Sequence, residues 1–569
     1  MKNKNRHQDM TAVKWMYRVS KKHMTGVIAY GVLSVVLAFA GVLSALGTKN
    51  IVNGATYRDL TLLTEGAIIL GVILGVQFIF KIVSRNIFER SKAKIELGLR
   101  AHIFKTVLKK DYSAVSAFHS GEILNRITSD VGVVTDGIMS LLPRLITLIV
   151  RLVVAVVIMA SFDPLFTAVF VVGGAVLVGF SRLIKRYLKE IHKKSQESDG
   201  KVRSFMQESL GEVLVIKVFD AYKQIGAKAD RLLGENYRVR IKRATMSIFA
   251  SSGINLVFSA GHLFAIIWGG YRVYNGFIDI GEMSAILQLV NQIQGPLSSL
   301  SGFLPSFYAT VASAERLMEF ENLPDEKNSD KKIDDINDFY SKLDSIKIND
   351  VTFSYGREVV LENASCEIQK GDFVAITGIS GIGKSTLFKL MMGVLAPQKG
   401  EITLCGEDYN VYASCETRRL FSYVPQGNLL FSGTLYENIT FMSDSKTKEE
   451  IDTAIRLSCC DEFINELEQG LDTVLCERGQ GLSEGQAQRV AIARAILYDA
   501  PVILLDEATS ALDEATEKRL IENLREFQNK TLLLITHKKA ALSVCNKELK
   551  IIDGKIIIEK AGECNENQI

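Results

Sequence analysis

Long apolar runs alternate with charged stretches in the first half of the chain. Six runs approach or exceed the length of about 20 residues that a membrane-spanning helix needs. They cover approximately residues 25–46, 66–83, 137–160, 164–180, 248–268 and 283–304. Buried core helices of a soluble protein are the alternative, but those seldom run so far without a charged face. The pattern therefore predicts an all-α membrane domain with six transmembrane helices over residues 1–320.

Basic residues are concentrated in alternate intervals between these runs. Residues 1–24 carry 7 lysines and arginines, residues 81–135 carry 10, and residues 181–247 carry 16. The interval 47–65 carries two lysines or arginines, the interval 271–282 carries one, and the turn 161–164 carries none. Because basic loops stay on the cytoplasmic side, both termini and both long loops are expected in the cytoplasm.

The two long basic intervals have a helical pattern with few glycines or prolines. We expect them to extend the membrane helices into the cytoplasm, with bends at residues 111–121 and 211–223. Two dozen helical residues project about 35 Å. A cytoplasmic partner domain could dock on the tips of these extensions.

The pattern changes after residue 320. Residues 321–345 mix acidic and basic side chains, which is typical of a linker. From residue 346 to 569, short β-branched runs such as Phe373–Thr377 and Val502–Asp506 alternate with helical stretches. This alternation predicts a separate α/β domain with a largely parallel sheet.

A glycine-rich segment follows the first of those runs directly, and a helical stretch follows it. Residues 378–386 read Gly-Ile-Ser-Gly-Ile-Gly-Lys-Ser-Thr, which matches G-x-x-x-x-G-K-[ST] in its strand–loop–helix context. Backbone N–H groups of such a loop surround phosphates, and the helix N-terminus favours their charge. The residues expected to bind nucleotide are Gly378, Ser380, Gly381, Gly383, Lys384, Ser385 and Thr386. Lys384 would reach the β- and γ-phosphates of ATP, and Ser385 would bind Mg²⁺.

The run 502–507 ends in two carboxylates, Asp506 and Glu507. Asp506 is expected to position Mg²⁺, and Glu507 to polarise the attacking water. Taken alone, this motif has an alternative interpretation, in which the two acidic residues end a strand and have only a structural role. The upstream phosphate loop favours the catalytic interpretation and predicts a P-loop ATPase domain.

Between these motifs stands Leu482-Ser483-Glu484-Gly485-Gln486. With this motif, the chain resembles ATP-binding-cassette (ABC) transporters of the exporter type over essentially its whole length. The resemblance implies an adenine-stacking role for Tyr355, a Mg²⁺-sensing role for Gln426 and a γ-phosphate contact for His537. Ser483, Gly485 and Gln486 match the family signature, and Asp513 lies in the loop that crosses the dimer. Thr473 and residues 477–479 resemble the loop that touches the intracellular helices in exporters.

The usual signature is L-S-G-G-Q, so Glu484 is a departure from the family pattern. A carboxylate facing a γ-phosphate would be repelled, and we therefore expect Glu484 to point away from the nucleotide. Because signature and phosphate loop each occur once, the resemblance implies a half-transporter that works as a dimer. A homodimer is favoured, and pairing with a related half-transporter is the alternative.

The net charge and the positions of the cysteines restrict the possible binding partners and the cellular compartment of the protein. The net charge of +3 gives no reason to propose nucleic acid as a partner. All 8 cysteines lie between Cys366 and Cys564, which excludes a disulfide-stapled secreted protein and indicates a reducing cytosol. The lysine-rich start and the lack of a transit-peptide pattern favour a bacterial plasma membrane.

Polar residues within the apolar runs are candidates for the substrate cavity. Arg144 and Arg151, seven residues apart, share a helix face, and Arg151 is placed near the middle of the membrane. Structural pairing with a carbonyl or a glutamate is the alternative to a cavity role. Gln288, Asn291 and Gln292 precede a Gly295-Pro296 kink, and amides are unfavourable in lipid unless they face a cavity or neighbouring helices.

These features predict ATP-driven export of an amphipathic, drug-like or peptide-like compound by alternating access. A flippase for a lipid or lipid-linked precursor, with Arg144 and Arg151 meeting phosphate, is the close alternative. An ATP-gated channel or regulatory subunit is a third hypothesis, against which the intact Glu507 argues.

Overall fold

The structure is a computed structural model of the 569-residue chain. It describes residues 2–326, 333–407, 409–427, 430–441, 443, 445–476, 479, 481–525 and 529–560. Within these ranges, the side chains of residues 2–9, 174–189, 192–193, 250–251, 254, 294–302, 304, 525, 539–540 and 560 are not described. The chain divides into two compact units. One unit comprises residues 1–106 and 120–322, and the other comprises residues 107–119 and 323–569.

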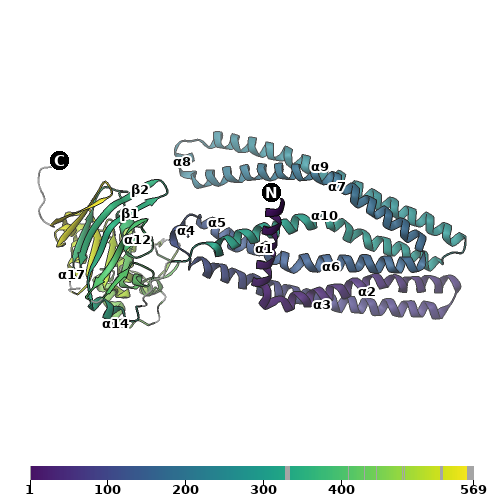
Figure 1. The fold of residues 1–569 in the computed structure, drawn as a ribbon, viewed down its shortest axis with the longest axis horizontal. Coiled ribbons are helices and arrows are strands. Elements are labelled where there is room, and N and C mark those ends of the chain that lie inside the picture. The colour runs from purple at the N-terminus through teal and green to yellow at the C-terminus, as the bar shows by residue number, and fades with distance from the viewer. Residues whose placement is uncertain are drawn as a thin grey trace. The chain divides into compact units, whose positions relative to one another are not determined.

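The first unit is entirely helical in its described part, and most of its helices are long (Figure 1). A 3₁₀ turn (Lys21–His23) joins the first two helices, and a π-helical turn (Arg126–Asp130) precedes α6. The helices are α1 (Lys2–Ser20), α2 (Met24–Tyr57), α3 (Leu60–Val107), α5 (Ser120–Asn125), α6 (Val131–Phe162), α7 (Pro164–Gly211), α8 (Val213–Val218), α9 (Tyr222–Tyr274) and α10 (Ile280–Asn322).

Both predicted bends coincide with helix breaks. The chain leaves α3 at Val107 and resumes a long helical path at Ser120, and it breaks again between Gly211 and Tyr222 around the short helix α8. The helical intervals predicted on either side of these breaks are confirmed. Helix α10 continues through Gly295 and Pro296, whose side chains lie outside the described residues, so the predicted kink stays a prediction.

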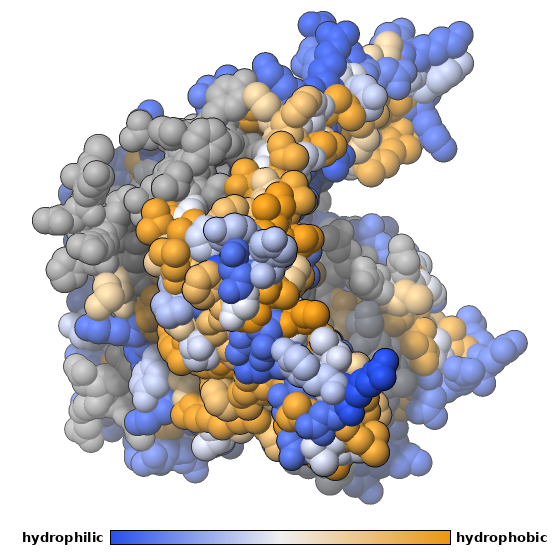
Figure 2. Space-filling model, turned by 90° about the vertical axis from the view of Figure 1, so that its right-hand side faces the viewer, coloured by the Kyte–Doolittle hydropathy of each residue, from blue (hydrophilic) through white to orange (hydrophobic). Residues whose placement is uncertain are grey.

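Four helical stretches in the described part are long and apolar enough to cross a membrane: residues 10–57, 60–107, 120–162 and 255–274. On α3, Ile68, Val72, Leu74 and Phe78 are all more than half exposed. Figure 2 shows apolar side chains, interspersed with polar ones, over the face that it displays. Exposed apolar surface of this extent is typical of contact with lipid or with another protein. The predicted fourth and sixth runs include undescribed side chains, so a count of six spans stays a prediction.

Asp163, at the turn between α6 and α7, is the centre of a buried polar network. Its Oδ1 accepts from the N–H groups of Leu165 and Phe166, both at 3.1 Å, and so caps α7. Its Oδ2 accepts from Trp268 Nε1 at 3.0 Å and from Arg272 Nε at 2.9 Å, both on α9. A single carboxylate therefore ties the start of α7 to the last turns of α9.

The second unit contains three β-sheets with helices beside them (Figure 1). The six-stranded sheet has the order β12 (Lys555–Lys560), β11 (Lys547–Ile552), β3 (Phe373–Thr377), β10 (Thr531–Ile535), β9 (Val502–Asp506) and β6 (Phe421–Val424). The four-stranded antiparallel sheet has the order β2 (Glu358–Gln369), β1 (Leu343–Tyr355), β4 (Lys399–Gly406) and β5 (Tyr409–Tyr412). A small sheet pairs β7 (Gly433–Thr434) with β8 (Val474–Leu475).

The helices of this unit connect and cover the sheets. They are α4 (Tyr112–Ser116), α11 (Ile336–Ser341), α12 (Lys384–Met391), α13 (Leu435–Thr440), α14 (Lys448–Leu457), α15 (Asp461–Ile464), α16 (Glu484–Tyr498), α17 (Glu514–Arg525) and α18 (Lys539–Leu542). Two 3₁₀ turns span Thr417–Leu420 and Gly470–Asp472.

The six-stranded sheet is buried on both faces, as its continuous apolar strands predict. Val502 and Leu504 of β9 join one hydrophobic cluster with Phe388 of α12, whereas Ile503 and Leu505 join another cluster with Val490 of α16. Alternate residues of a strand point to opposite faces, so both helices pack on this sheet from opposite sides. The predicted α/β class is confirmed, although the unit also contains antiparallel strands.

A short piece of the helical half of the sequence belongs to this second unit. The N–H of Asp111 donates to Pro324 O at 2.9 Å, and Lys110 Nζ donates to Leu323 O at 2.8 Å. Glu326, three residues further on, pairs with Arg418 at 3.2 Å. Arg418 also donates to Met392 O and Gly393 O, just after α12. These bonds, which we call the Lys110–Arg418 tether, fix residues 107–119 to the segment after α12.

The Asp163 network generates a stability prediction. Asp163→Asn should lower the free energy of unfolding by about 3 kcal/mol, because it leaves the largely buried Arg272 guanidinium without its carboxylate partner. Thermal unfolding of the purified protein in detergent measures the effect.

Glu235→Gln is the matched control, because the Arg231–Glu235 pair is exposed on both sides and such pairs contribute little. Equal melting temperatures for the two variants would contradict a central role of Asp163.

Candidate nucleotide site and membrane cavity

The predicted nucleotide residues follow neighbouring parallel strands. In the six-stranded sheet, β3, β10, β9 and β6 lie side by side and run parallel. The glycine-rich loop follows β3, His537 follows β10, Glu507 follows β9 and Gln426 follows β6. Because carboxyl ends of parallel strands share one edge, the sheet brings four distant motifs to that edge, where α/β proteins bind ligands.

The phosphate loop has a backbone that requires glycine. Gly378, Gly381 and Gly383 have φ values of +143°, +82° and +111°, which side chains rarely adopt. A Cβ at Gly378 would come within 2.8 Å of Ile551 O, and one at Gly383 would collide with Val360. Ser380 lies exposed on this loop, and Ser385 and Thr386 lie in the first turn of α12. The loop is therefore shaped so that its backbone can approach a ligand closely.

Lys384 is buried at the first position of α12, with 5% of its surface exposed. Its Nζ donates to Gly378 O at 2.7 Å and to Ile379 O at 3.1 Å, and it lies 3.3 Å from His537 Nε2. The sequence prediction assigned Lys384 and His537 to the same phosphate, and the structure places them together. No carboxylate pairs with Lys384 among the residues described, so its charge is available to an anion.

The acidic strand end has two carboxylates with different surroundings. Asp506, which is 1% exposed, accepts from Tyr423 Oη at 3.0 Å. Burial, followed by the charge of Asp506, raises the pKa of Tyr423, so this hydroxyl stays a donor. Glu507 has φ +51°, its N–H donates to Ile535 O, and its Oε2 accepts from Gln426 Nε2 at 2.6 Å. The strained backbone turns Glu507 out of the strand toward Gln426.

The signature motif forms the start of α16. Ser483 is its N-cap: its Oγ accepts from Gln486 N at 3.2 Å, and Gln486 Oε1 accepts from Ser483 N at 2.8 Å. This capping box holds both side chains in place. Glu484 is exposed in the first turn, where the helix dipole favours a carboxylate. At Gly485, a Cβ would come within 2.9 Å of Ala511 O, so glycine permits close approach of the loop before α17.

The remaining predicted residues lie outside these clusters. Tyr355 ends β1, is half exposed, and packs edge-on against Phe353 with centroids 4.9 Å apart. Asp513 accepts from Thr516 N at 3.0 Å at the start of α17, and this hydrogen bond lowers the pKa of Asp513. Thr473 O accepts from Leu435 N, whereas Glu477 and Arg478 lie outside the described residues.

Three residues that the sequence interpretation did not single out support these motifs. The hydroxyl of Tyr423 donates to Asp506, and the position of Tyr423 three residues before Gln426 was the available signal. Gln488 donates to Ser510 Oγ at 3.0 Å and accepts from Ala511 N at 3.1 Å, which links α16 to the loop before α17. Lys538, next to His537, donates to Thr509 O and Leu512 O and so braces the same loop.

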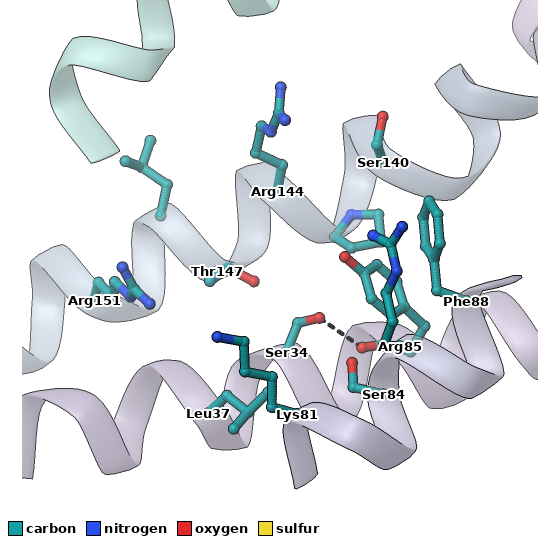
Figure 3. A pocket seen from close by; sticks show the side chains of 13 residues that line it. Ser34, Leu37, Lys81, Ser84, Arg85, Phe88, Ser140, Arg144, Thr147 and Arg151 are labelled. Carbon is teal, nitrogen blue, oxygen red and sulfur yellow. Dashed lines mark hydrogen bonds between the residues drawn. The ribbon is translucent and has the colours of Figure 1, made fainter. Parts of the chain in front are cut away.

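The helical unit contains a cavity of about 700 Å³ between α2, α3 and α6. Arg144 and Arg151 both line it, together with Lys81 and Arg85 of α3 (Figure 3). The rest of the lining is hydroxylic or apolar: Tyr30, Ser34, Leu37, Ser84, Phe88, Ser140, Pro143, Thr147 and Leu148. The prediction that Arg144 and Arg151 share a helix face agrees with their placement in this lining. The sequence analysis did not identify Lys81 and Arg85 as lining residues.

The amides predicted to line a cavity do not line this one. Gln288 Nε2 donates to Ser44 Oγ at 2.9 Å, and Gln292 Nε2 lies 3.5 Å from the same hydroxyl. Asn291 is exposed. Ser44 on α2 gives Gln288 and Gln292 a partner across a helix–helix contact, which is the other way to accommodate amides among apolar helices.

The residues of the sheet edge fit a nucleotide with a divalent cation. Glycine-rich backbone and Lys384 are suited to phosphates, and the hydroxyl of Ser385 and the carboxylate of Asp506 are oxygen ligands of the kind Mg²⁺ prefers. The exposed ring of Tyr355 offers a face for stacking.

Comparison with known protein families agrees with this division of the chain. The family model for the ABC transporter transmembrane region matches residues 27–297. A second model, described as ABC transporter, matches residues 361–510. Together they cover most of the chain and include the phosphate loop, the signature and the acidic strand end.

Curated relatives are similar over most of this chain. An ATP-dependent lipid A-core flippase of Desulfotalea psychrophila is 29% identical over 486 residues, covering 84% of this chain and 83% of the relative. The alpha-hemolysin translocation ATP-binding protein HlyB of Escherichia coli O157:H7 is 28% identical over 477 residues, covering 83% of this chain and 66% of HlyB.

A solved structure shares the fold. The structure of a bacterial Atm1-family ABC exporter with ATP bound has a TM-score of 0.80 and 23% sequence identity, with 95% of each chain covered. The two matched regions, the relatives and the shared fold lead to one conclusion. The chain belongs to the ABC transporter family, as an ATP-hydrolysing exporter of the multi-pass membrane type with its transmembrane and nucleotide-binding regions fused.

Proposed function

We propose that the protein exports an amphipathic compound across a bacterial plasma membrane, powered by ATP, through alternating access of a dimer. The observation that carries this proposal is the common edge of β3, β10, β9 and β6, where Lys384, His537, Glu507 and Gln426 gather. That edge has the parts of an ATPase, and it is fused to helices that are apolar enough to span a membrane.

The proposed roles of the chain's own residues follow from their contacts. Lys384 donates to the β- and γ-phosphates of ATP in place of the carbonyls of Gly378 and Ile379. Glu507, oriented by Gln426, accepts a proton from the attacking water, and His537 donates to the γ-phosphate. Mg²⁺, held by Ser385, Gln426 and Asp506, would neutralise phosphate charge. Tyr355 stacks on adenine.

A dimer is proposed because the signature needs a phosphate loop to face. Among the described residues, Ser483 and Gln486 form hydrogen bonds with each other and within α16, and none of these bonds reaches residues 378–386. A second copy, or a related half-transporter, would place its phosphate loop against Ser483 and Gly485, and Asp513 would lie near that seam. ATP binds the closed dimer better than the open one, and this difference shifts the membrane helices.

The basic intervals support the proposed orientation. Residues 81–135 and 181–247 carry 10 and 16 lysines and arginines, against one to two in the intervals 47–65 and 271–282. The positive-inside rule then places the termini and the nucleotide-binding domain in the cytoplasm.

A second candidate function is that of a flippase for a lipid or lipid-linked precursor. The observation that favours it is the lining of the cavity by Arg144 and Arg151, whose charges suit a phosphate. A neutral drug-like or peptide-like cargo gives these arginines no partner. The flippase therefore explains the cavity better, and both candidates share the same ATPase cycle.

Glu507→Gln tests the proposed hydrolysis. The amide keeps the shape of the side chain but cannot accept the proton, so the ATPase rate should fall by about 100- to 10,000-fold while ATP binding persists. Phosphate release and binding of a fluorescent ATP analogue are the two measurements.

Glu522→Gln, an exposed carboxylate on α17, is the control and should hydrolyse ATP at the wild-type rate. A Glu507→Gln protein that retains wild-type turnover would refute the assignment of the base.

Co-purification tests the proposed dimer. Two copies of this chain with different affinity tags, expressed together, should elute together, and ATP should strengthen the association in the Glu507→Gln background. Co-expression of wild-type and Lys384→Ala chains should also yield mixed dimers with strongly reduced turnover, because each site needs both chains. A strictly monomeric protein that hydrolyses ATP at full rate would contradict the dimer.

A further inference from the structure

The lining of the cavity in the helical unit carries positive charge only. Its lining includes four cations, Lys81, Arg85, Arg144 and Arg151, and no aspartate or glutamate. Arg85 pairs with Glu89, one turn away and outside the lining. Lys81, Arg144 and Arg151 form no ion pair with any residue that the structure describes. The cavity therefore holds positive charge that the protein does not neutralise.

Several other cations of the helical unit have carboxylate partners. Lys49 pairs with Glu282 at 3.0 Å, Lys92 with Asp136 at 2.6 Å, and Arg272 with Asp163 at 2.9 Å. Each pair joins two different helices or a helix and a turn. Because an unpaired charge among membrane helices is costly, pairing is the expected arrangement. Three unpaired cations around one cavity depart from that arrangement and indicate a ligand of opposite charge.

The spacing of the cations indicates how large the charged part of the ligand is. Lys81 and Arg85 are one turn apart on α3, which corresponds to about 6 Å along the helix axis. Arg144 and Arg151 are two turns apart on α6, which corresponds to about 10 Å. All four residues line the same cavity. In Figure 3, Lys81 and Arg85 extend from α3, whereas Arg144 projects from α6 on the side away from α3. Two cations about 10 Å apart along α6 favour a ligand with more than one anionic group, such as a diphosphate or two separate phosphates.

The uncharged lining indicates the rest of the ligand. Leu37, Phe88, Pro143 and Leu148 supply apolar surface beside the cations. Thr147 Oγ1 is buried without a hydrogen-bond partner in the described part of the chain, and Thr147 lies between Arg144 and Arg151 along α6. A phosphate oxygen would satisfy this hydroxyl. The volume of about 700 Å³ falls within the range of sites for drug-sized ligands.

We infer that this cavity binds the head group of an amphiphile that carries at least two negative charges on phosphate, with Lys81, Arg144 and Arg151 as its recognition residues. The arginine guanidinium offers forked donors that match phosphate oxygens, and Thr147 adds a neutral donor. Arg85, already paired with Glu89, contributes less. This inference rests on the proposed transport function and specifies its substrate class as a lipid-type phosphate or diphosphate.

Binding to the purified protein in a neutral maltoside detergent, without nucleotide, tests the inference. The probes are a long-chain alkyl diphosphate, an alkylphosphocholine of equal chain length, and inorganic pyrophosphate. The alkyl diphosphate should bind with a Kd about tenfold or more below that of the other two. Equal binding of the phosphocholine would overturn the charge requirement, and equal binding of pyrophosphate would overturn the lipid assignment.

Charge-removing variants identify the recognition residues. Lys81→Gln, Arg144→Gln and Arg151→Gln should each raise the Kd of the alkyl diphosphate about tenfold, since each removes a charged hydrogen-bond donor. Arg144→Lys and Arg151→Lys should recover part of that loss. Arg90→Gln, a change on α3 away from the cavity, is the matched control and should leave the Kd unchanged. Unchanged affinity in all three Gln variants would overturn the inference.

The melting temperature without ligand separates recognition from a structural role. If these cations serve a ligand, the Gln variants should melt at or above the wild-type temperature, because each removes an unneutralised charge. Lower melting temperatures would show that the cations stabilise the fold and would overturn the inference. Basal ATPase activity is measured in parallel: its absence from the wild type would refute the transport function and leave the binding result standing.

Discussion

Positive charge without a carboxylate partner is the physical constraint on which both candidate sites depend. In the nucleotide-binding unit, Lys384 is buried against two carbonyls and His537. In the helical unit, Lys81, Arg144 and Arg151 surround a cavity with no acid in its lining. Burial of Lys384 without a carboxylate costs free energy, and a bound anion would offset that cost. Lys81 and Arg144 are exposed, and an unpaired charge among membrane helices favours a ligand of opposite charge. Several other cations of the helical unit are paired instead, as Arg272 is with Asp163.

The nucleotide site could be predicted from the sequence to an unusual extent, because its determinants are local. The phosphate loop depends on glycines at fixed spacing after a strand, and their positive φ values are the reason for that spacing. The order of the strands in the sheet could not be predicted from the sequence. The contact between Gln426 and Glu507, which are 81 residues apart, depends on that order and therefore could not be predicted either. Tyr423 was overlooked because a tyrosine in a buried strand has an ordinary packing role unless its hydroxyl has a known partner.

The membrane cavity was predictable only in part, because it depends on which helices are neighbours. The spacing of Arg144 and Arg151 on one helix predicts a shared face. Lys81 and Arg85 belong to another helix, and only the packing of α3 near α6 makes them part of the same lining. The same limit explains the amides of α10: the sequence shows that Gln288 needs a polar partner, but not that Ser44 supplies it.

The Lys110–Arg418 tether has a consequence for the biosynthesis of this chain. Lys110 and its acceptor Leu323 are separated by 213 residues, and Arg418 lies still further along. At about 5–20 residues per second, a ribosome needs on the order of 10–40 s to translate that interval. Residues 107–119 therefore emerge from the ribosome before their partners are synthesised. They stay without these partners until most of the other helices have been inserted. The nucleotide-binding unit is thus completed late, after insertion of the helices, when two separate stretches of the polypeptide come together in one domain.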